Sequence, residues 1–243
     1  MKIILLADGT VGNKIAKYLI DNYIDDLYLI VTIEVNETYL EAKKKGCPVC
    51  IFESEKNLLS TIGNDLDLGI LAYWPKILKN SLLRVPRNGF VNTHPSLLPY
   101  NRGKHYFFWA LVEQAPFGVT LHRVDSGVDT GDIIAQKRIN YDWCDTGESL
   151  YEKSQIAICE LFFDTYPLLR IGKYELRPQD LQEGSFHRSS ELDLASKVEL
   201  DSLYRAADLL NLLRARTFES YPGCWFETDG ERFEISLKIR KIN

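Results

Sequence analysis

The sequence predicts an α/β protein whose main part is a largely parallel sheet, followed by a small C-terminal region with a helix and a β-hairpin. Apolar runs alternate with helically spaced apolar residues along the first half of the chain, and such βαβ units form parallel sheets. Further on, Asp229-Gly230 separates two strand-like runs, which is a strong hairpin signal. The repeats are too few for an eight-stranded barrel, so we expect an open, doubly wound sheet.

The expected strands are short apolar segments. The first of them is continuously apolar, which is typical of a strand that is buried on both faces. In chain order, the strands of the sheet are expected at 3–7, 27–33, 49–52, 66–72, 90–92, 118–124 and 133–139. A loop rich in glycine and aspartate joins the last two of these strands.

Helices are expected where apolar residues recur every three or four positions. The second helix should stop at Gly46, because glycine favours the C-terminal cap. The long fourth helix should begin after Asp145 or Thr146, since both residue types favour the N-terminal cap. In chain order, the helices are expected at 11–20, 38–45, 104–113, 147–164 and 199–215.

The composition excludes several classes of protein. The chain has 243 residues, of which 45% are hydrophobic and 26% charged, the balance of a soluble globular protein. No apolar run approaches the ~20 residues that span a bilayer, and MKIILLADGT is interpreted as a buried strand rather than a signal peptide. The net charge of −5 argues against a surface built for nucleic acid. Five scattered cysteines favour a reducing compartment, so we expect a cytoplasmic protein.

Two short motifs each have a functional and a structural interpretation. Cys47-Pro-Val-Cys50 is formally a CxxC motif, but a zinc site would need a second pair or nearby histidines, so two small residues beside a strand are favoured. Gly9 to Gly12 form a turn before a helix, where free N–H groups can bind an anion. The dinucleotide fingerprint is incomplete there, although Glu34 lies where its acidic residue would be. A tight turn that lets the helix pack on the strand is favoured.

The segment from Asn92 to Pro99 is the densest in chemistry-bearing residues. The apolar run ends at Asn92, so Asn92 and His94 are expected just beyond the carboxyl end of a strand. Ligands bind at that edge of an open parallel sheet. Residues two apart in extended backbone point the same way, so an amide and an imidazole should share one side of a crevice.

Three carboxylates lie within the run from Asp125 to Asp132. The run does not match the alternating acids and final glutamate of an EF-hand loop. One carboxylate could instead orient the histidine, as the third group of a catalytic triad does. A polar turn with favourable Asp-Gly chemistry explains the same residues equally well.

Asn92-Thr93-His94-Pro95-Ser96-Leu97-Leu98-Pro99, with the later Val128-Asp129-Thr130-Gly131, resembles the signature of the formyltetrahydrofolate-dependent formyltransferases. This family includes glycinamide ribonucleotide transformylase, methionyl-tRNA formyltransferase and the nucleotide-sugar N-formyltransferases. The resemblance covers about residues 1–180. It implies a Rossmann-like formyltransferase domain, with Asn92, His94 and Asp129 as the catalytic residues and 10-formyltetrahydrofolate as co-substrate.

The resemblance also implies a folate site and a reaction. Segment 71–78 is similar to the family's folate-lining segment, and loop 123–129 would close over the pterin. The implied folate-binding residues are Tyr73, Trp74, Lys76, Ile77, Leu97, Asp125 and Gly127. As an amine attacks the formyl carbon, an amide N–H of Asn92 can stabilise the oxyanion and His94 can accept the amine's proton. Asp129 would orient the imidazole, and no metal is required.

The members of this family differ in the acceptor of the formyl group, and features of the sequence distinguish among them. Methionyl-tRNA formyltransferases are generally longer, with a basic C-terminal domain, whereas this chain is acidic. Glycinamide ribonucleotide transformylases carry a Gly-Ser-Asn phosphate turn, from which the turn at Gly9 departs. A formyltetrahydrofolate hydrolase would share the catalytic residues but normally adds an N-terminal regulatory domain. Segments 187–193, 214–218 and 221–223 resemble the C-terminal extension of nucleotide-sugar N-formyltransferases.

We therefore expect two domains, a formyltransferase domain at 1–185 and a small C-terminal extension with the helix and hairpin at 186–243. Basic groups can hold a pyrophosphate, and Tyr221 or Trp225 can stack on a nucleobase. The residues expected to bind the acceptor are Gly9, Thr10, Arg102, Lys104, His105, Arg216 and Tyr221.

The expected function is transfer of a formyl group to the amine of a nucleotide-linked amino dideoxy sugar. The expected nucleotide is dTDP, and the product would feed surface polysaccharide or O-antigen biosynthesis. The alternatives are a glycinamide ribonucleotide transformylase-like purine enzyme and a non-catalytic protein that binds folate or a nucleotide. The exposed edge of the C-terminal hairpin could pair with a second copy in a homodimer. Neither nucleic acid nor a membrane is an expected partner.

Overall fold

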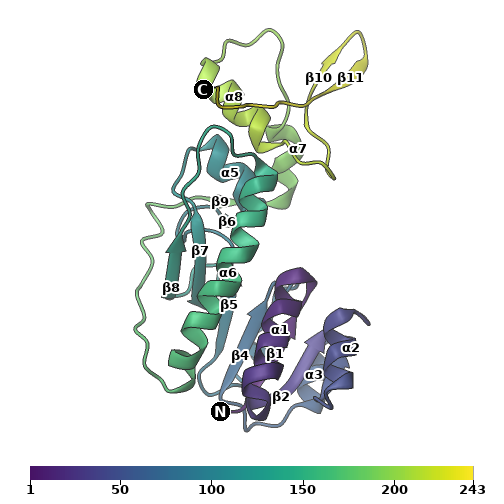
Figure 1. Ribbon diagram of the computed structural model, residues 1–243, viewed down its shortest axis with the longest axis vertical. Coiled ribbons are helices and arrows are strands. Elements are labelled where there is room, and N and C mark those ends of the chain that lie inside the picture. The colour runs from purple at the N-terminus through teal and green to yellow at the C-terminus, as the bar shows by residue number, and fades with distance from the viewer. Residues whose placement is uncertain (243) are drawn as a thin grey trace. The chain divides into compact units, whose positions relative to one another are not determined.

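A computed structural model describes residues 1–242 (Figure 1). The strands are β1 Ile3–Ala7, β2 Leu27–Thr32, β3 Val49–Ile51, β4 Leu68–Ala72, β5 Phe90–His94, β6 Arg102–Gly103, β7 Gly118–Arg123, β8 Ile133–Arg138, β9 Phe186–His187, β10 Cys224–Thr228 and β11 Glu231–Ile235. The α-helices are α1 Gly9–Tyr23, α2 Glu37–Lys44, α3 Glu55–Thr61, α4 Asn80–Leu83, α5 Tyr106–Val112, α6 Gly147–Arg170, α7 Leu192–Ala195 and α8 Ala206–Ala215. No helix within residues 1–242 is long and apolar enough to cross a membrane.

The main sheet has seven strands in the order β3-β2-β1-β4-β5-β7-β8. The five strands from β3 to β5 pair in parallel, and β7 pairs antiparallel to β5. Strands β2 and β3 lie on one side of β1, and the next strand in the chain, β4, lies on the other side of β1. This reversal creates a topological switch point, the place where open α/β sheets bind ligands. The predicted α/β fold class is confirmed.

The N-terminal strands form from apolar runs that the sheet buries completely. All five residues of β1 and of β4 are buried, which explains their continuous hydrophobicity. Helix α1 buries six residues at helical spacing. Gly12 lies on that face, where a Cβ atom would stand 3.0 Å from the carbonyl oxygen of Ala72. The glycine turn therefore permits close packing of helix on strand, as the favoured interpretation expected.

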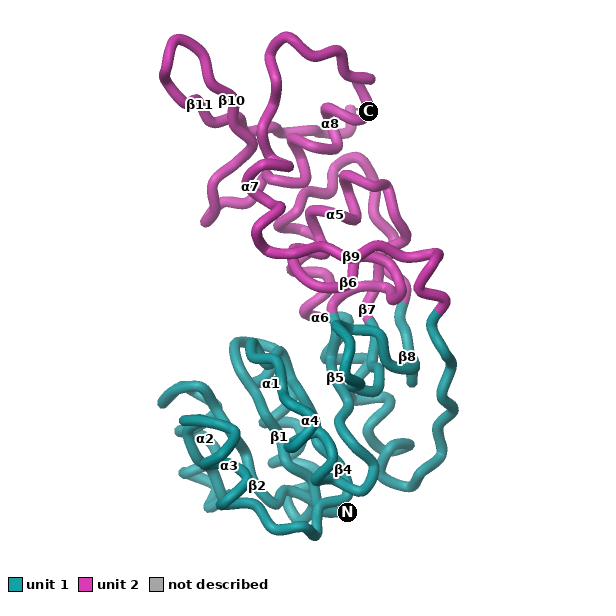
Figure 2. The backbone as a smooth tube through the Cα atoms, turned by 180° about the vertical axis from the view of Figure 1, so that it is seen from behind, with its two compact units in different colours: residues 1–94, 120–137, 157–179 teal, residues 95–119, 138–156, 180–243 magenta. Residues whose placement is uncertain are grey.

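The chain divides into two compact units, which interleave in sequence (Figure 2). Unit 1 contains residues 1–94, 120–137 and 157–179, and unit 2 contains residues 95–119, 138–156 and 180–243. The boundary near residue 185 between a catalytic domain and a C-terminal extension stays a prediction.

Unit 2 has its own apolar core around α5 and α8. Phe108, Leu111 and Ala215 are fully buried in it. The hairpin β10-β11 turns at Asp229 and Gly230, with φ values of 52° and 80°. Two consecutive positive φ values characterise a type I′ turn, so this predicted hairpin is present.

Several element bounds differ from the expected ones. The helix expected at 199–215 begins only at Ala206, because a turn occupies the preceding residues. In that turn the Glu199 amide donates to the hydroxyl of Tyr204 at 2.9 Å. Strand β5 is longer than expected and includes both Asn92 and His94. The long helix α6 starts after Thr146, whose hydroxyl accepts a hydrogen bond from the Ser149 amide at 3.3 Å.

Candidate active site

The site is built on the carboxyl end of β5, in unit 1. Asn92 and His94 are the third and fifth residues of this strand, so both side chains leave the same face of the sheet. The antiparallel register places Asn92 opposite His122 of β7. Strand pairing alone thus brings the amide and a second imidazole together.

Asp129 completes a cluster with these side chains. Its Oδ1 atom lies 3.4 Å from Nδ1 of His94 and 3.6 Å from Nε2 of His122. The amide nitrogen of Asn92 donates to the same oxygen at 3.5 Å. The His94 side chain is 6% exposed and that of Asp129 is 14% exposed. Because the surroundings exclude most water, these polar groups interact more strongly than they would at the surface.

His122 is the functional residue that sequence reasoning missed. Its Nδ1 atom lies 2.7 Å from the backbone oxygen of Arg123. A carbonyl oxygen only accepts, so Nδ1 carries the proton and Nε2 of the neutral ring is an acceptor. The Asn92 amide, 3.2 Å from Nε2, therefore donates to His122. This bond fixes which end of the Asn92 side chain faces the cluster.

The loop between β7 and β8 carries Asp129 in left-handed backbone, with φ of 54°. Asp125 organises the loop from within: its Oδ1 accepts from the Gly127 amide at 3.0 Å and from the Thr130 hydroxyl at 2.7 Å. Of the three carboxylates in this run, Asp129 is therefore the one that reaches the histidines, while Asp125 shapes the turn. The turn interpretation applies to Asp125, and the orienting role of Asp129 stays a prediction.

The predicted folate-binding residues are mostly in unit 1. Tyr73, Trp74, Lys76 and Ile77 directly follow β4, and Asp125 and Gly127 lie in the Asp129 loop, whereas Leu97 belongs to unit 2. The Tyr73 amide donates to the Thr93 hydroxyl at 3.2 Å, which joins the end of β4 to β5. Trp74 packs edge-on against Phe52, with ring centroids 5.3 Å apart. Ile77 is 84% exposed. The folate-binding roles of these residues stay predictions.

The residues predicted to bind the acceptor are divided between the units. Gly9 and Thr10 begin α1 in unit 1, and the other five belong to unit 2. Burial lowers the pKa of His105, and the positive charges of Arg216 and Lys104 lower it further. These three basic groups are therefore neighbours within unit 2.

Arg102 and Tyr221 also belong to unit 2. Arg102 pairs with Phe186 in the short ladder between β6 and β9. Tyr221 is exposed and meets Phe218 edge-on, with ring centroids 4.9 Å apart. A cavity of about 350 Å³ in this unit is lined by Asp193, Arg216, Pro222, Gly223, Trp225, Arg232 and Glu234.

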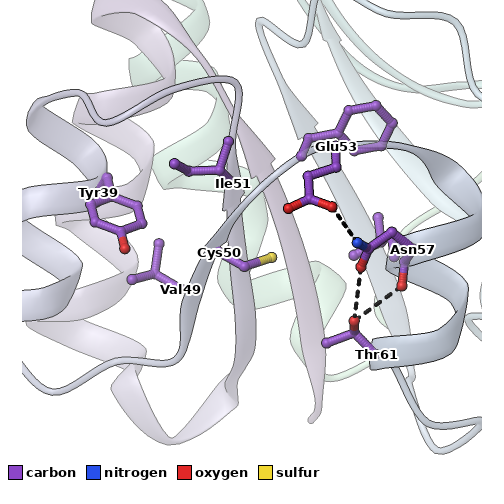
Figure 3. Close-up of a pocket in the computed structure, with 9 residues that line it drawn as sticks. Tyr39, Val49, Cys50, Ile51, Glu53, Asn57 and Thr61 are labelled. Carbon is purple, nitrogen blue, oxygen red and sulfur yellow. Dashed lines mark hydrogen bonds between the residues drawn. The ribbon is translucent and has the colours of Figure 1, made fainter.

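A second cavity, of about 320 Å³, lies in unit 1 beside the edge strand β3 (Figure 3). It is lined by Tyr39, Val49, Cys50, Ile51, Phe52, Glu53, Asn57, Leu58 and Thr61, and none of these residues belongs to the cluster around Asp129. Burial raises the pKa of the Cys50 and Cys47 thiols. A raised pKa disfavours the reactive thiolate, which agrees with the structural interpretation of this CxxC motif.

The donor atoms of His94, His122 and Asp129 lie within 4.8 Å of one another, a spacing that would also admit a metal ion. Imidazole and carboxylate are common metal ligands. In the tautomer of His122 described above, the ring nitrogen that could bind a metal is Nε2, and this atom already accepts a hydrogen bond from the Asn92 amide. A metal ion bound here would compete with the Asn92 amide for Nε2 of His122.

These features define an α/β protein with a buried polar cluster at the carboxyl edge of its sheet, the edge at which open α/β sheets bind ligands. Residues 37–164 match the family model described as formyl transferase. Since this match spans more than half of the sequence, the chain belongs to the formyl transferase family. Residues 191–241 match a second family model, the N-formyltransferase dimerization C-terminal domain.

Curated relatives agree with this family assignment. The chain is 31% identical over 175 residues to a methionyl-tRNA formyltransferase from Agathobacter rectalis, a match that covers 71% of this chain and 55% of that protein. The chain spans about half the length of the curated relatives it matches.

Two solved structures cover nearly the whole fold. A 4-N formyltransferase from Francisella tularensis has a TM-score of 0.84 at 23% identity, over 99% of this chain and 98% of that chain. A formyltransferase from Anoxybacillus kamchatkensis, in complex with UDP-4,6-dideoxy-4-formamido-L-AltNAc and tetrahydrofolate, has a TM-score of 0.59 at 29% identity, over 87% and 97% of the two chains. The predicted family and fold are both confirmed.

Proposed function

We propose that this protein transfers a formyl group from 10-formyltetrahydrofolate to the amine of a nucleotide-linked amino sugar. The observation that carries the proposal is the buried cluster of Asn92, His94 and Asp129 at the end of β5. The cluster supplies an amide donor, a base and an orienting carboxylate, which are the three groups that acyl transfer to an amine requires.

We propose a role for each group of the cluster. Attack of the amine on the formyl carbon places negative charge on the formyl oxygen, and an amide N–H of Asn92 donates to it. His94 accepts the proton that the attacking amine loses. The carboxylate of Asp129, 3.4 Å from Nδ1 of His94, orients the ring so that Nε2 serves as the base, and it stabilises the resulting imidazolium. The His94 imidazolium then returns the proton to the folate nitrogen as the bond from that nitrogen to the formyl carbon breaks, which releases tetrahydrofolate and the N-formyl product.

Folate as the donor is supported by the related structure that contains tetrahydrofolate. In this chain, the segment after β4 places Tyr73 and Trp74 beside β5, because the Tyr73 amide bonds to Thr93. We propose that this segment, with the Asp125 and Gly127 loop of the same unit, binds the folate. A mostly apolar wall with few polar groups is typical of such cofactor sites.

A nucleotide sugar as the acceptor is supported by three observations. One related structure contains a UDP-linked formamido sugar, and the other is named a 4-N formyltransferase. The C-terminal match is to an N-formyltransferase domain. The neighbouring basic groups of Lys104, His105 and Arg216 suit a diphosphate, since Arg and Lys bind phosphate oxygens through charge-assisted hydrogen bonds. We propose dTDP as the nucleotide, UDP as the second candidate, and surface polysaccharide synthesis as the use of the product.

The acceptor can be identified directly. Purified protein would be incubated with 10-formyltetrahydrofolate and a panel of dTDP-, UDP- and GDP-linked 3-amino and 4-amino sugars, and mass spectrometry would detect the gain of one formyl group. One strongly formylated sugar is the expected result. Formylation of glycinamide ribonucleotide or methionyl-tRNA instead would overturn the proposed acceptor. Folate binding without transfer to any acceptor would favour the binding-only alternative.

A further inference from the structure

Gln179 lies in the segment that follows α6, far from the catalytic motifs in sequence. Two backbone hydrogen bonds anchor this segment to the start of β8. The Ile133 amide donates to the Arg177 oxygen at 2.8 Å, and the Arg177 amide donates back to Ile133 at 2.9 Å. Pro178 follows and restricts the backbone, so Gln179 is held close to the loop that ends at β8.

The carboxamide of Gln179 contacts the backbone of the Asp129 loop at two points. Its Nε2 atom donates to the carbonyl oxygen of Asp129 at 3.0 Å and to that of Gly131 at 2.6 Å. Its Oε1 atom is buried and accepts no hydrogen bond from the residues that the structure describes. Within unit 1, the Gln179 side chain therefore binds this loop by donating hydrogen bonds to its backbone carbonyl oxygens.

The loop needs such a restraint at Asp129. This residue has positive φ, a conformation that non-glycine residues adopt at a cost of about 1 kcal/mol or more. The hydrogen bonds of Asp125 hold the preceding part of the loop, and the Arg123 amide holds the following part through the Asp132 oxygen at 2.8 Å. The Gln179 side chain binds the backbone of Asp129 itself.

We propose that Gln179 is a positioning residue for the reaction: it holds the Asp129 backbone so that the carboxylate stays beside His94 and His122. The inference rests on the proposed function. A small displacement of Asp129 would leave the loop folded but would spoil the orientation of His94. Misplacement of a catalytic group by about 1 Å can lower a rate by ~100-fold.

The test compares Gln179→Leu with Gln182→Leu, an exposed glutamine three residues further along the same segment. We expect Gln179→Leu to lower kcat by about 10- to 100-fold and Gln182→Leu to change it by less than twofold. In an Asp129→Ala background, Gln179→Leu should have almost no further effect, because the group it positions is gone. Equal losses in both backgrounds would indicate a general structural role and overturn the proposal.

A spectroscopic measurement separates this inference from the proposed activity. The chain has four histidines, so a long-range ¹H–¹⁵N spectrum of the imidazole rings resolves each one. Gln179→Leu should shift the ring nitrogens of His94 and His122 and leave those of His105 and His187 in place. A spectrum identical to that of the wild type contradicts the inference even if no acceptor is ever formylated, whereas shifted rings with no transfer contradict only the proposed function.

A second variant distinguishes loss of positioning from loss of folding. Gln179→Glu keeps the size of the side chain but faces two carbonyl oxygens without a donor, and Gln182→Glu is its control for charge. The Glu variant should reproduce the losses of the Leu variant. If both Gln179 variants lose the near-ultraviolet circular dichroism of the folded protein, the role of Gln179 is in folding and the proposal is wrong.

Discussion

The polar side chains gathered at the carboxyl end of β5 restrain one another through hydrogen bonds. His122 accepts from the Asn92 amide, and this bond leaves the second amide hydrogen directed toward Asp129 at 3.5 Å. That longer contact is weak by geometric criteria, so the hydrogen is available to a developing oxyanion. The arrangement explains why an amide, rather than a second charged donor, stands at position 92.

Replacing Asn92 by Ala should remove the oxyanion donor. We expect kcat to fall by about 100- to 1,000-fold, as it does when one such donor is removed from other acyl-transfer sites. The KM for the acceptor should change little, because the bond forms mainly in the transition state. Steady-state kinetics would measure both values. The control is Asn88→Ala, at an exposed asparagine, and a similar loss in that variant would contradict the assigned role.

Removal of metal ions tests the cluster in a different way. Because Nε2 of His122 accepts from the Asn92 amide and Asp129 lies beside Nδ1 of His94, dialysis against a chelator should leave the rate of formyl transfer unchanged. The rate would be compared before and after dialysis, and after readdition of zinc. Loss of activity that zinc restores would identify the cluster as a metal site instead.

At the residue scale, the sequence could predict Asn92 and His94 because they lie two apart in one strand. It could not predict His122, which carries no motif. Its place opposite Asn92 depends on the antiparallel register of β5 and β7, and strand pairing between segments 30 residues apart leaves no local pattern. Alternation of apolar residues with His122 along 118–124 was the available signal.

At the scale of elements, the packing of β4 on β5 holds the catalytic strand in place. Gly69 of β4 faces the ring of Phe90, the first residue of β5, and a Cβ atom at position 69 would lie 2.2 Å from a ring carbon. Phe90 is fully buried, so the ring cannot move aside without disturbing its neighbours.

Gly69→Ala should therefore destabilise the protein by about 1–3 kcal/mol, the usual cost of overpacking a core. Urea denaturation would measure the free energy of unfolding. Gly63→Ala is the matched control, since its Cβ atom would meet only the Tyr28 hydroxyl at an ordinary 3.7 Å. Equal stability of the two variants would show that Phe90 can repack.

The junction of α6 with the segment before β2 predicts how stability depends on pH. Burial alone would raise the pKa of Asp26, but hydrogen bonds from Arg170 at 2.7 Å and Tyr166 at 2.9 Å hold the pKa below its ordinary value of 3.8. The folded state then binds fewer protons than the unfolded state in this range. The contribution of Asp26 is present above about pH 4 and is lost as the pH falls through the lowered pKa.

Thermal unfolding measured between pH 7 and pH 2 tests this expectation. Asp26→Asn should be less stable than the wild type at neutral pH, and the difference should shrink as the pH falls below 3.8. Asp21→Asn, at a half-exposed aspartate, should keep the wild-type pH dependence. A difference between Asp26→Asn and wild type that stays constant with pH would contradict the role of the Asp26 carboxylate.

The elements themselves were predictable where local chemistry determines them. Continuous apolar runs marked β1 and β4, and Asp229-Gly230 marked the hairpin turn, because these signals act within a few residues. The helix expected to start at 199 begins at 206 because apolar spacing continued through residues that form a turn. The short helices α3 and α4 were not expected, since seven and four residues give too little periodicity.

At the scale of the whole molecule, the match of 191–241 to a dimerization domain supports the predicted homodimer. The hairpin β10-β11 is a two-stranded sheet by itself within the described residues, and unpaired strand edges readily pair with another chain.

We expect light scattering to give twice the 27.9 kDa of one chain. Phe233→Glu on the hairpin, where Phe233 is 40% exposed, should shift the mass toward one chain. Leu40→Glu, at an exposed leucine outside residues 191–241, should not. A monomeric wild type would contradict the predicted dimer.

The central claim is that the cluster at the end of β5 transfers a formyl group, and His94→Ala tests it most directly. The measurement is the single-turnover rate of tetrahydrofolate formation, with the acceptor identified from the sugar panel and folate binding measured in parallel. Loss of the general base should lower this rate by about 100- to 10,000-fold while folate binding is retained. A His94→Ala variant that transfers the formyl group at the wild-type rate would contradict the account.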